Sequence, residues 1–278
     1  MGDTPKPPAG TTPCTFLRFE IWNLGSPPGC YDTSGLRGTT VYCLAMGGKT
    51  AAQDLKPSEI GGNVAAIRKR IARAAKKAGR SPSEVTLVAV TKTVDASAIQ
   101  EAFAAGLRHF GESRIQEARE KIPALSCLDP HPTWHMVGHL QTNKAKIATE
   151  LFDVVHSVDS LKVAEAISQH ADCDLSVLVQ VNVAGEASKY GFALQDTIAA
   201  LEHIARLPHL RIKGLMTIAP YADDPEEVRP VFRRLRLMRD SLGLEQLSMG
   251  MSHDFEVAIE EGATLVRIGR AIFGGREE

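Results

Sequence analysis

The sequence predicts a single (β/α)8 barrel, and three observations support this fold class. Eight short apolar runs alternate with amphipathic stretches, and the 278 residues exceed the roughly 250 that such a barrel needs. The first run is followed by Lys92-Thr93-Val94, with no glycine. A doubly wound open sheet is the alternative, but it usually has fewer strands and often a glycine-rich first loop.

The apolar runs are the expected strands, and the stretches between them are the expected helices. The strands are expected at 85–91, 108–111, 134–138, 153–157, 176–183, 212–218, 245–249 and 264–268. The helices are expected at 95–105, 113–122, 142–150, 160–170, 194–206, 225–241 and 253–261. A further helix precedes the first strand, because Val64, Ile67 and Ile71 recur at helical spacing before Gly79.

The chain divides into two regions of different composition. Residues 1–57 are rich in proline and glycine and show no sustained periodicity. They also lack the basic start and long apolar core of a secretory signal. We expect a disordered or non-native N-terminal extension over 1–57 and the barrel over 58–278.

The bulk composition excludes several function classes. Hydrophobic residues make up 44% of the chain and the net charge is −1, which is typical of a soluble globular protein. No apolar run approaches the roughly 20 residues of a membrane span. The basic residues at 68–77 have no interleaved aromatic residues, so we expect a solvated helix face and no nucleic-acid partner. Five cysteines, an odd number with no CxxC pair, favour a reducing, cytoplasmic compartment.

Lys92 is the first candidate site residue. It closes an apolar run that reads as a buried strand, and an ammonium is costly to desolvate. An amine held at such a strand end tends to act as a nucleophile toward aldehydes. The alternative is a lysine that extends to solvent at a strand end.

Polar residues and glycines also follow the other strands, where the working residues of a barrel lie. Asn182 and Met216 come at the ends of two middle strands. Ser252 stands as a possible N-cap of the helix after the seventh strand, while Gly269 and Arg270 follow the eighth. Exposed N–H groups at these two ends would bind phosphate, although simple helix capping and a tight turn remain open.

The first and eighth strands are neighbours in a closed barrel, so Lys92 would lie beside the predicted phosphate site. The ligand that fits both carries an aldehyde and a phosphate. Pyridoxal 5′-phosphate (PLP) fits, and so does a phosphorylated sugar bound as a Schiff base, as in a class I aldolase. A metal site is not expected, because His135 and His139 lie across a strand end and not on a helix.

Several segments resemble one protein family. Residues 87–94 (LVAVTKTV) resemble the lysine strand of the pyridoxal phosphate homeostasis proteins, also called YggS-like or proline synthetase co-transcribed proteins. Residues 134–144 (WHMVGHLQTNK) resemble that family's WHFIGxLQxNK segment. Residues 247–255 (LSMGMSHDF) and 266–274 (VRIGRAIFG) resemble its C-terminal signature. The resemblance covers about residues 60–276, and it implies the barrel of the N-terminal domain of alanine racemase.

The resemblance also implies roles for individual residues. Lys92 would form the Schiff base with PLP, and Ser252, Gly269 and the Arg270 backbone would hold the phosphate. Arg267 would face the pyridine nitrogen, which weakens the ring as an electron sink. Lys189 matches a second lysine of the family and would act as an acceptor or relay for the cofactor.

Two positions depart from the family pattern. The family usually reads GEN after the second strand, whereas this chain has Gly111-Glu112-Ser113. The family often has threonine where this chain has Arg270. We expect binding to survive with altered affinity, because a guanidinium or the backbone N–H can replace the lost hydroxyl.

The leading hypothesis is a PLP carrier and regulator without strong catalytic activity, which would hand PLP to apo-enzymes. Racemases of this fold use a second domain and a tyrosine from a neighbouring subunit, and we expect neither here. An amino-acid racemase is the alternative, followed by a class I aldolase. The family suggests a monomer, sometimes a dimer.

Overall fold

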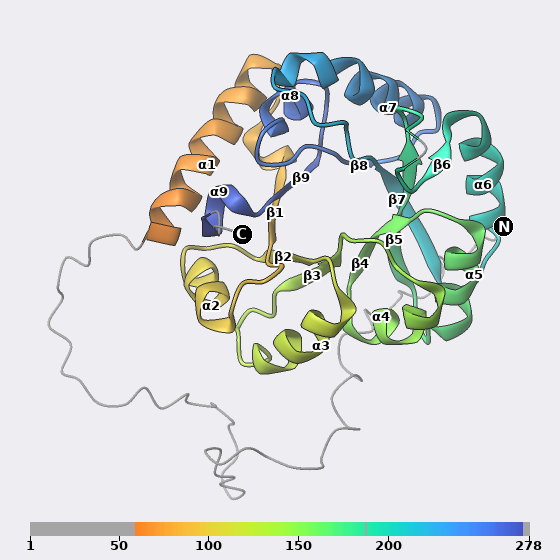
Figure 1. Ribbon diagram of the computed structural model, residues 1–278, viewed down its shortest axis with the longest axis horizontal. Helices are drawn as coiled ribbons and strands as arrows, with labels where there is room; N and C mark the ends of the chain where they lie inside the picture. The colour runs from red at the N-terminus through yellow and green to blue at the C-terminus, as the bar shows by residue number, and fades with distance from the viewer. Residues whose placement is uncertain (1–58, 187, 275–278) are drawn as a thin grey trace, which may run out of the picture. The chain divides into compact units, whose positions relative to one another are not determined.

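The computed structural model describes residues 59–186 and 188–274. The expectation for residues 1–57 lies outside this described part. The described residues form a ring of parallel strands surrounded by helices (Figure 1), which confirms the predicted barrel.

Eight strands close the barrel. They are β1 (Thr86–Val90), β2 (His109–Glu112), β3 (Thr133–Met136), β4 (Val154–Val158), β5 (Leu175–Asn182), β7 (Leu210–Met216), β8 (Gln246–Ser248) and β9 (Leu265–Ile268). The strand order is β4-β3-β2-β1-β9-β8-β7-β5, and pairing of β4 with β5 closes the ring. The two-residue strand β6 (Phe192–Ala193), which the sequence did not predict, pairs with β5 alone.

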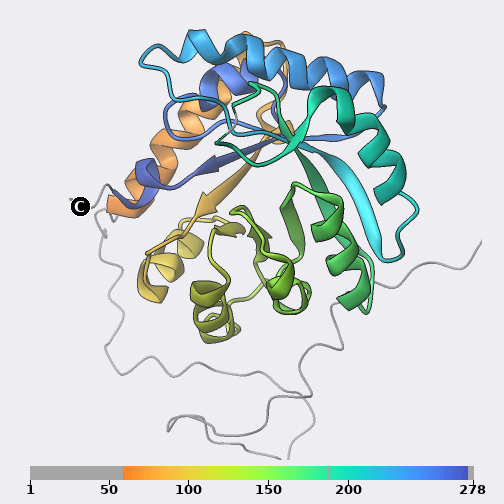
Figure 2. The same cartoon turned by 45° about the vertical axis from the view of Figure 1, so that its right-hand side comes forward.

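Helices cover the outside of this ring (Figure 2). They are α1 (Glu59–Lys77), α2 (Ala96–Ala104), α3 (Ile115–Ala124), α4 (Ala145–Leu151), α5 (Leu161–His170), α6 (Thr197–Ile204), α7 (Arg229–Ser241), α8 (Phe255–Glu260) and α9 (Arg270–Phe273). Short 3-10 turns precede three of them: η3 (Thr142–Lys144), η4 (Leu194–Asp196) and η5 (Pro225–Val228). A fourth, η2 (Pro82–Glu84), precedes β1. Each of the seven helices between strands therefore begins within two residues of its predicted start. Three of them begin there as a 3-10 turn.

Local sequence explains where several helices begin. The Asp95 carboxylate accepts a hydrogen bond from the Ala98 N–H at 2.8 Å and caps α2. Ser160 caps α5 in the same way through the N–H of Val163. The main core lies between strands and helices, where large aromatic side chains such as Phe110 are fully buried.

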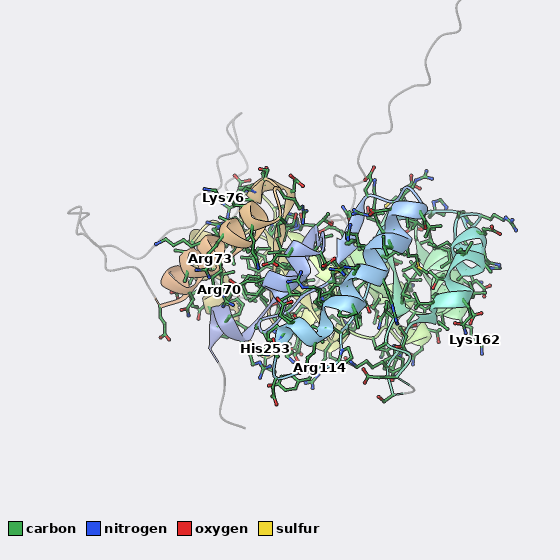
Figure 3. All side chains as sticks on the ribbon, turned by 90° about the horizontal axis from the view of Figure 1, so that it is seen from above. Arg70, Arg73, Lys76, Arg114, Lys162 and His253 are labelled. Carbon is green, nitrogen blue, oxygen red and sulfur yellow. The ribbon has the colours of Figure 1, made fainter. Side chains whose placement is uncertain are left out.

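The basic face of α1 is paired with acidic residues. Figure 3 labels Arg70 and Arg73 along this helix, and both guanidinium groups contact the Glu256 carboxylate of α8, at 2.8 and 3.1 Å. Lys77 pairs with Glu260 of the same helix at 2.8 Å. The face that was expected to be solvated therefore also carries ion pairs to α8.

None of the helices in the described residues combines the length and apolar character that crossing a bilayer requires.

Candidate active site at the carboxyl ends of the strands

Lys92 lies two residues beyond the end of β1. Thr91 directs its side chain to Glu112 on the helix side of the sheet, and Lys92 is the first residue of the turn that follows. The Lys92 side chain is exposed. This corrects the expectation of a buried amine and places the residue at the open mouth of the barrel.

A buried network fixes the backbone immediately before Lys92. The Thr91 hydroxyl donates to the Glu112 carboxylate at 2.7 Å, and the Lys121 ammonium donates to the Thr91 carbonyl at 2.7 Å. Lys121 also contacts the Glu112 carboxylate at 3.1 Å. Burial raises the pKa of Glu112, although its bonds with Thr91 and Lys121 oppose the shift.

The residue after Lys92 is held in an unusual conformation. Thr93 has φ +59°, in the left-handed region that β-branched residues rarely adopt. Its N–H donates to the Glu117 carboxylate at 2.7 Å, and Lys121 holds the same carboxylate at 2.9 Å. Burial pushes the pKa of Glu117 upward, but these hydrogen bonds outweigh it and the net shift is downward. Lys92 is therefore held between two anchored neighbours.

The end of β9 lies beside the end of β1. Ala89 pairs with Ile268, and a Cβ added to Gly269 would come 3.1 Å from the Val90 carbonyl oxygen. Glycine at 269 thus allows the turn before α9 to approach the strand that leads to Lys92. The predicted closeness of residues 92 and 269 is consistent with this register.

The turn after β8 departs from the prediction in one respect. Ser252 is half-buried, but it is not the N-cap of α8, which begins at Phe255 after Asp254. The Asp254 carboxylate accepts instead from the Met251 N–H at 2.6 Å and closes a tight turn. The sequence placed the helix start too early, because an acidic turn residue closer to the helix took the capping position.

Gly250 opens the same turn with φ +93°, and an added Cβ would come 2.6 Å from the Ala258 Cβ. Its carbonyl accepts from the Arg267 N–H at 3.0 Å, which joins the turn after β8 to strand β9. The Arg270 side chain is exposed beside them. The backbone around 250–252 and 269–270 therefore lies on one side of the mouth.

Arg267 lies inside the barrel, where its side chain is buried. Its guanidinium donates to the Thr217 carbonyl at 2.8 Å and to the Ser248 hydroxyl. Burial lowers its pKa to about 10, although the negative charge of Asp254 opposes the shift. The side chain therefore stays a cation at neutral pH and accepts no hydrogen bonds.

Asn182 organises the loop that carries Lys189. Its amide donates to the carbonyls of Glu186 and Lys189 at 2.8 and 3.2 Å, and its oxygen accepts from the Gly185 N–H. The Lys189 ammonium pairs with the Glu186 carboxylate at 3.0 Å. If Asn182 affects ligand binding, it would therefore do so by positioning this loop.

Met216 is fully buried at the end of β7 in a small cluster inside the barrel. Its cluster partners are Val88, Leu178 and Leu265. The structure thus places Met216 in the interior packing near Arg267, not at the exposed mouth. A direct role in cofactor binding remains a prediction.

The structure reveals two groups that the sequence did not assign to a site. Inside the barrel, His109, His135 and His156 form a hydrogen-bonded series. At the rim, His139 stacks on Tyr190 with ring centroids 3.8 Å apart. The alternation of inward-facing residues along the strands could have indicated the first group. The stack of His139 on Tyr190 joins two loops, and no sequence pattern relates one loop to the other. Among the described residues, no group of acidic, histidine and cysteine side chains could hold a metal ion.

The comparison with protein families gives a match to the N-terminal domain of alanine racemase over residues 62–277. A pyridoxal phosphate homeostasis protein from Pseudomonas aeruginosa is 48% identical over 225 residues, which cover 79% of this chain and 97% of that protein. This chain belongs to the pyridoxal phosphate homeostasis family. The resemblance of the lysine and C-terminal motifs is thereby confirmed at the level of the family.

Solved structures agree with this assignment. PipY of Synechococcus elongatus, solved with PLP bound, has a TM-score of 0.68 and 38% identity, covering 77% of this chain and 100% of PipY. An alanine racemase from Corynebacterium glutamicum has a TM-score of 0.57 at 18% identity and covers 79% of this chain and 62% of the racemase. The racemase supports the fold alone.

Proposed function

We propose that this chain binds PLP covalently through Lys92 and acts in PLP homeostasis as a carrier, without strong catalytic activity. The observation that carries the proposal is the position of Lys92, two residues beyond the end of β1, while Gly269 directly follows the adjacent strand β9 and packs against Val90. The family assignment supports the same ligand. When bound, PLP supplies an aldehyde that forms a reversible covalent bond with an amine.

The described residues fit such a group. Lys92 would supply the amine, and Ser252, Gly269 and Arg270 would hold the phosphate in the segments that follow the paired strands β8 and β9. Arg267 is a buried cation, hydrogen-bonded to a carbonyl and a hydroxyl rather than to a carboxylate. A buried cation without a hydrogen-bonded acid is costly, which favours a functional reason for it.

Arg267 also bears on the choice between carrier and catalyst. It can only donate hydrogen bonds, so a ring nitrogen facing it would accept and remain unprotonated. An unprotonated ring stabilises negative charge on a substrate poorly. This favours storage of the aldehyde over amino-acid chemistry. We propose a cytoplasmic monomer that passes PLP to apo-enzymes, with Lys189 on the rim loop as an acceptor in that transfer.

The proposal is tested by titrating the protein with PLP and recording the absorbance of the bound cofactor. We expect a saturable band for the unchanged protein and for Lys144→Ala, whose lysine is in η3, and none for Lys92→Ala. Equal covalent binding by Lys92→Ala would contradict the assignment of the lysine. Exchange of amino-acid α-protons faster than with free PLP would favour the racemase.

A further inference from the structure

A continuous chain of hydrogen bonds runs through the interior of the barrel and ends at Arg267. His109 Nδ1 lies 3.0 Å from His135 Nε2, and His135 Nδ1 lies 2.9 Å from His156 Nε2. His156 Nδ1 lies 2.8 Å from the Ser248 hydroxyl, which also contacts the Arg267 guanidinium. We call these five residues the interior chain.

The interior chain crosses the barrel instead of following one wall. Its histidines come from the neighbouring strands β2, β3 and β4, whereas Ser248 and Arg267 come from β8 and β9. Strands β4 and β8 are separated by β5 and β7 in the ring. The bond between His156 and Ser248 therefore spans the interior, and it connects two halves of the wall.

The donors and acceptors of the interior chain have one consistent assignment. Arginine only donates, so the Ser248 oxygen accepts from Arg267. Among the described residues, His156 Nδ1 is the acceptor found within reach of the Ser248 O–H. His156 then donates from Nε2 to His135 Nδ1, and His135 donates from Nε2 to His109 Nδ1. All three rings carry their proton on Nε2.

Burial keeps the histidines neutral. It lowers the pKa of His135 to about 3, aided by the neighbouring His109 ring, and moves the pKa of His156 well below its usual value. The pKa of His109 is lowered as well, with Asp153 opposing the shift. At neutral pH a pKa of about 3 leaves about one His135 ring in ten thousand with a second proton. Transport of protons through charged imidazoles is therefore disfavoured, and a fixed arrangement is favoured.

We propose that Ser248, His156, His135 and His109 are positioning residues that hold the Arg267 guanidinium in one orientation toward the bound cofactor. This inference rests on the proposed function, since it concerns the side of Arg267 that faces the ligand. The Thr217 carbonyl fixes one nitrogen of the guanidinium and Ser248 fixes another. The histidines fix the hydroxyl in turn, because its single proton is directed to His156.

The far end of the interior chain is also defined. His109 is half-buried and lines a cavity of about 450 Å³ together with Thr86, Leu87 and Arg108, at the ends of β1 and β2 away from Lys92. The interior chain thus begins near the opposite opening of the barrel and ends at the proposed ligand.

The first test uses the cofactor-free protein and needs no ligand. Nitrogen NMR of 15N-histidine-labelled protein should show His135 and His156 neutral with the proton on Nε2, unchanged between about pH 5 and pH 8. A proton on Nδ1 of either ring, or titration of either within that range, would overturn the interior chain as assigned. The control variant His203→Gln, at an exposed site on α6, should leave both patterns unchanged.

The second test measures the effect on PLP. Ser248→Ala should weaken binding about tenfold, as expected for one lost hydrogen bond to a charged group. It should also shift the absorbance band of bound PLP. Ser248→Thr, which keeps the hydroxyl, should restore the band, and His203→Gln should alter neither property.

The outcomes separate the two proposals. A loss of thermal stability in Ser248→Ala with unchanged PLP affinity and absorbance would overturn the positioning role. Failure of the unchanged protein to bind PLP would contradict the proposed function, while the NMR pattern would still decide the geometry of the interior chain.

Discussion

Two buried polar networks flank the end of β1, and they use opposite chemistry. The interior chain contains three neutral rings, a hydroxyl and one cation, and within the described part of the protein no carboxylate is hydrogen-bonded to any of them. The network on the helix side, which we call the outer network, consists of Thr91, Glu112, Glu117 and Lys121 and carries two acids and one amine. The difference follows from position, because Lys121 reaches partly to solvent whereas His156 is fully buried.

The comparison shows that a barrel can organise the site of one lysine from two sides of the sheet, the helix side and the interior. The outer network fixes the backbone of Lys92 with ionic bonds that tolerate partial exposure. The interior chain orients Arg267 with neutral groups, because a fully buried acid without a partner would be costly. Removal of one member should therefore have a different consequence for the protein in each network.

The largest effect is expected from Lys121→Met. The change leaves the fully buried Glu112 without its cation, and one oxygen of that carboxylate already lacks a partner. We expect the free energy of unfolding to fall by about 3 kcal/mol. Chemical denaturation would measure this loss.

A matched control and a rescue sharpen this prediction. Lys162→Met on the exposed face of α5, labelled in Figure 3, should change stability by less than about 0.5 kcal/mol. Adding Glu112→Gln to Lys121→Met should recover part of the loss, because an amide carries no charge. A loss in Lys121→Met no larger than in the control would show that the outer network is not ionic.

The interior chain should make the free energy of unfolding depend on pH. The pKa of His135 is about 3 in the folded chain and about 6.5 when unfolded, so only the unfolded state gains a proton as pH falls from 7 to 5. Stability is then lost on acidification, by about 2 kcal/mol from this histidine alone. His135→Gln should lose about that much less over the same range in urea titrations at each pH. Parallel pH profiles would contradict a neutral buried ring.

A smaller effect is expected at Glu117. Glu117→Gln keeps the shape but weakens the bonds to the Thr93 N–H and to Lys121. We expect a loss of about 1 kcal/mol and slower reaction of Lys92 with PLP, because the left-handed turn is less well held. Stopped-flow absorbance would record the rate. An unchanged rate would show that this turn does not position Lys92.

The smallest effect is expected at the surface. Asp174 and Arg211 contact each other at 2.6 Å, but both side chains are largely exposed. Asp174→Asn should therefore change stability by about 0.5 kcal/mol or less. A loss of stability as large as that of Lys121→Met would mean that buried and exposed ion pairs do not differ in their contribution to stability.

The sequence predicted the architecture well, because each strand carries a compact apolar run that ends at a polar residue. Lys92 and Gly269 could be singled out because the barrel topology makes β1 and β9 neighbours, whereas the role of Arg267 was implied by the family resemblance. Helix starts were less predictable where two turn residues compete, as Ser252 and Asp254 do. The two-residue β6 is too short to leave a pattern.

The rest of the site depends on contacts between distant segments. His156 and Ser248 lie 92 residues apart, and nothing in the local sequence of either indicates the other. Lys121 reads as one more charged residue of an amphipathic helix until the structure places it beside the Thr91 carbonyl. Such groups become visible only once the ring of strands is closed.

The covalent role of Lys92 is tested most directly by reducing the PLP-loaded protein with borohydride and mapping the modified peptide by mass spectrometry. The account predicts a single pyridoxyl group on Lys92, in the segment between β1 and α2. Modification confined to Lys189 or spread over surface lysines would contradict it.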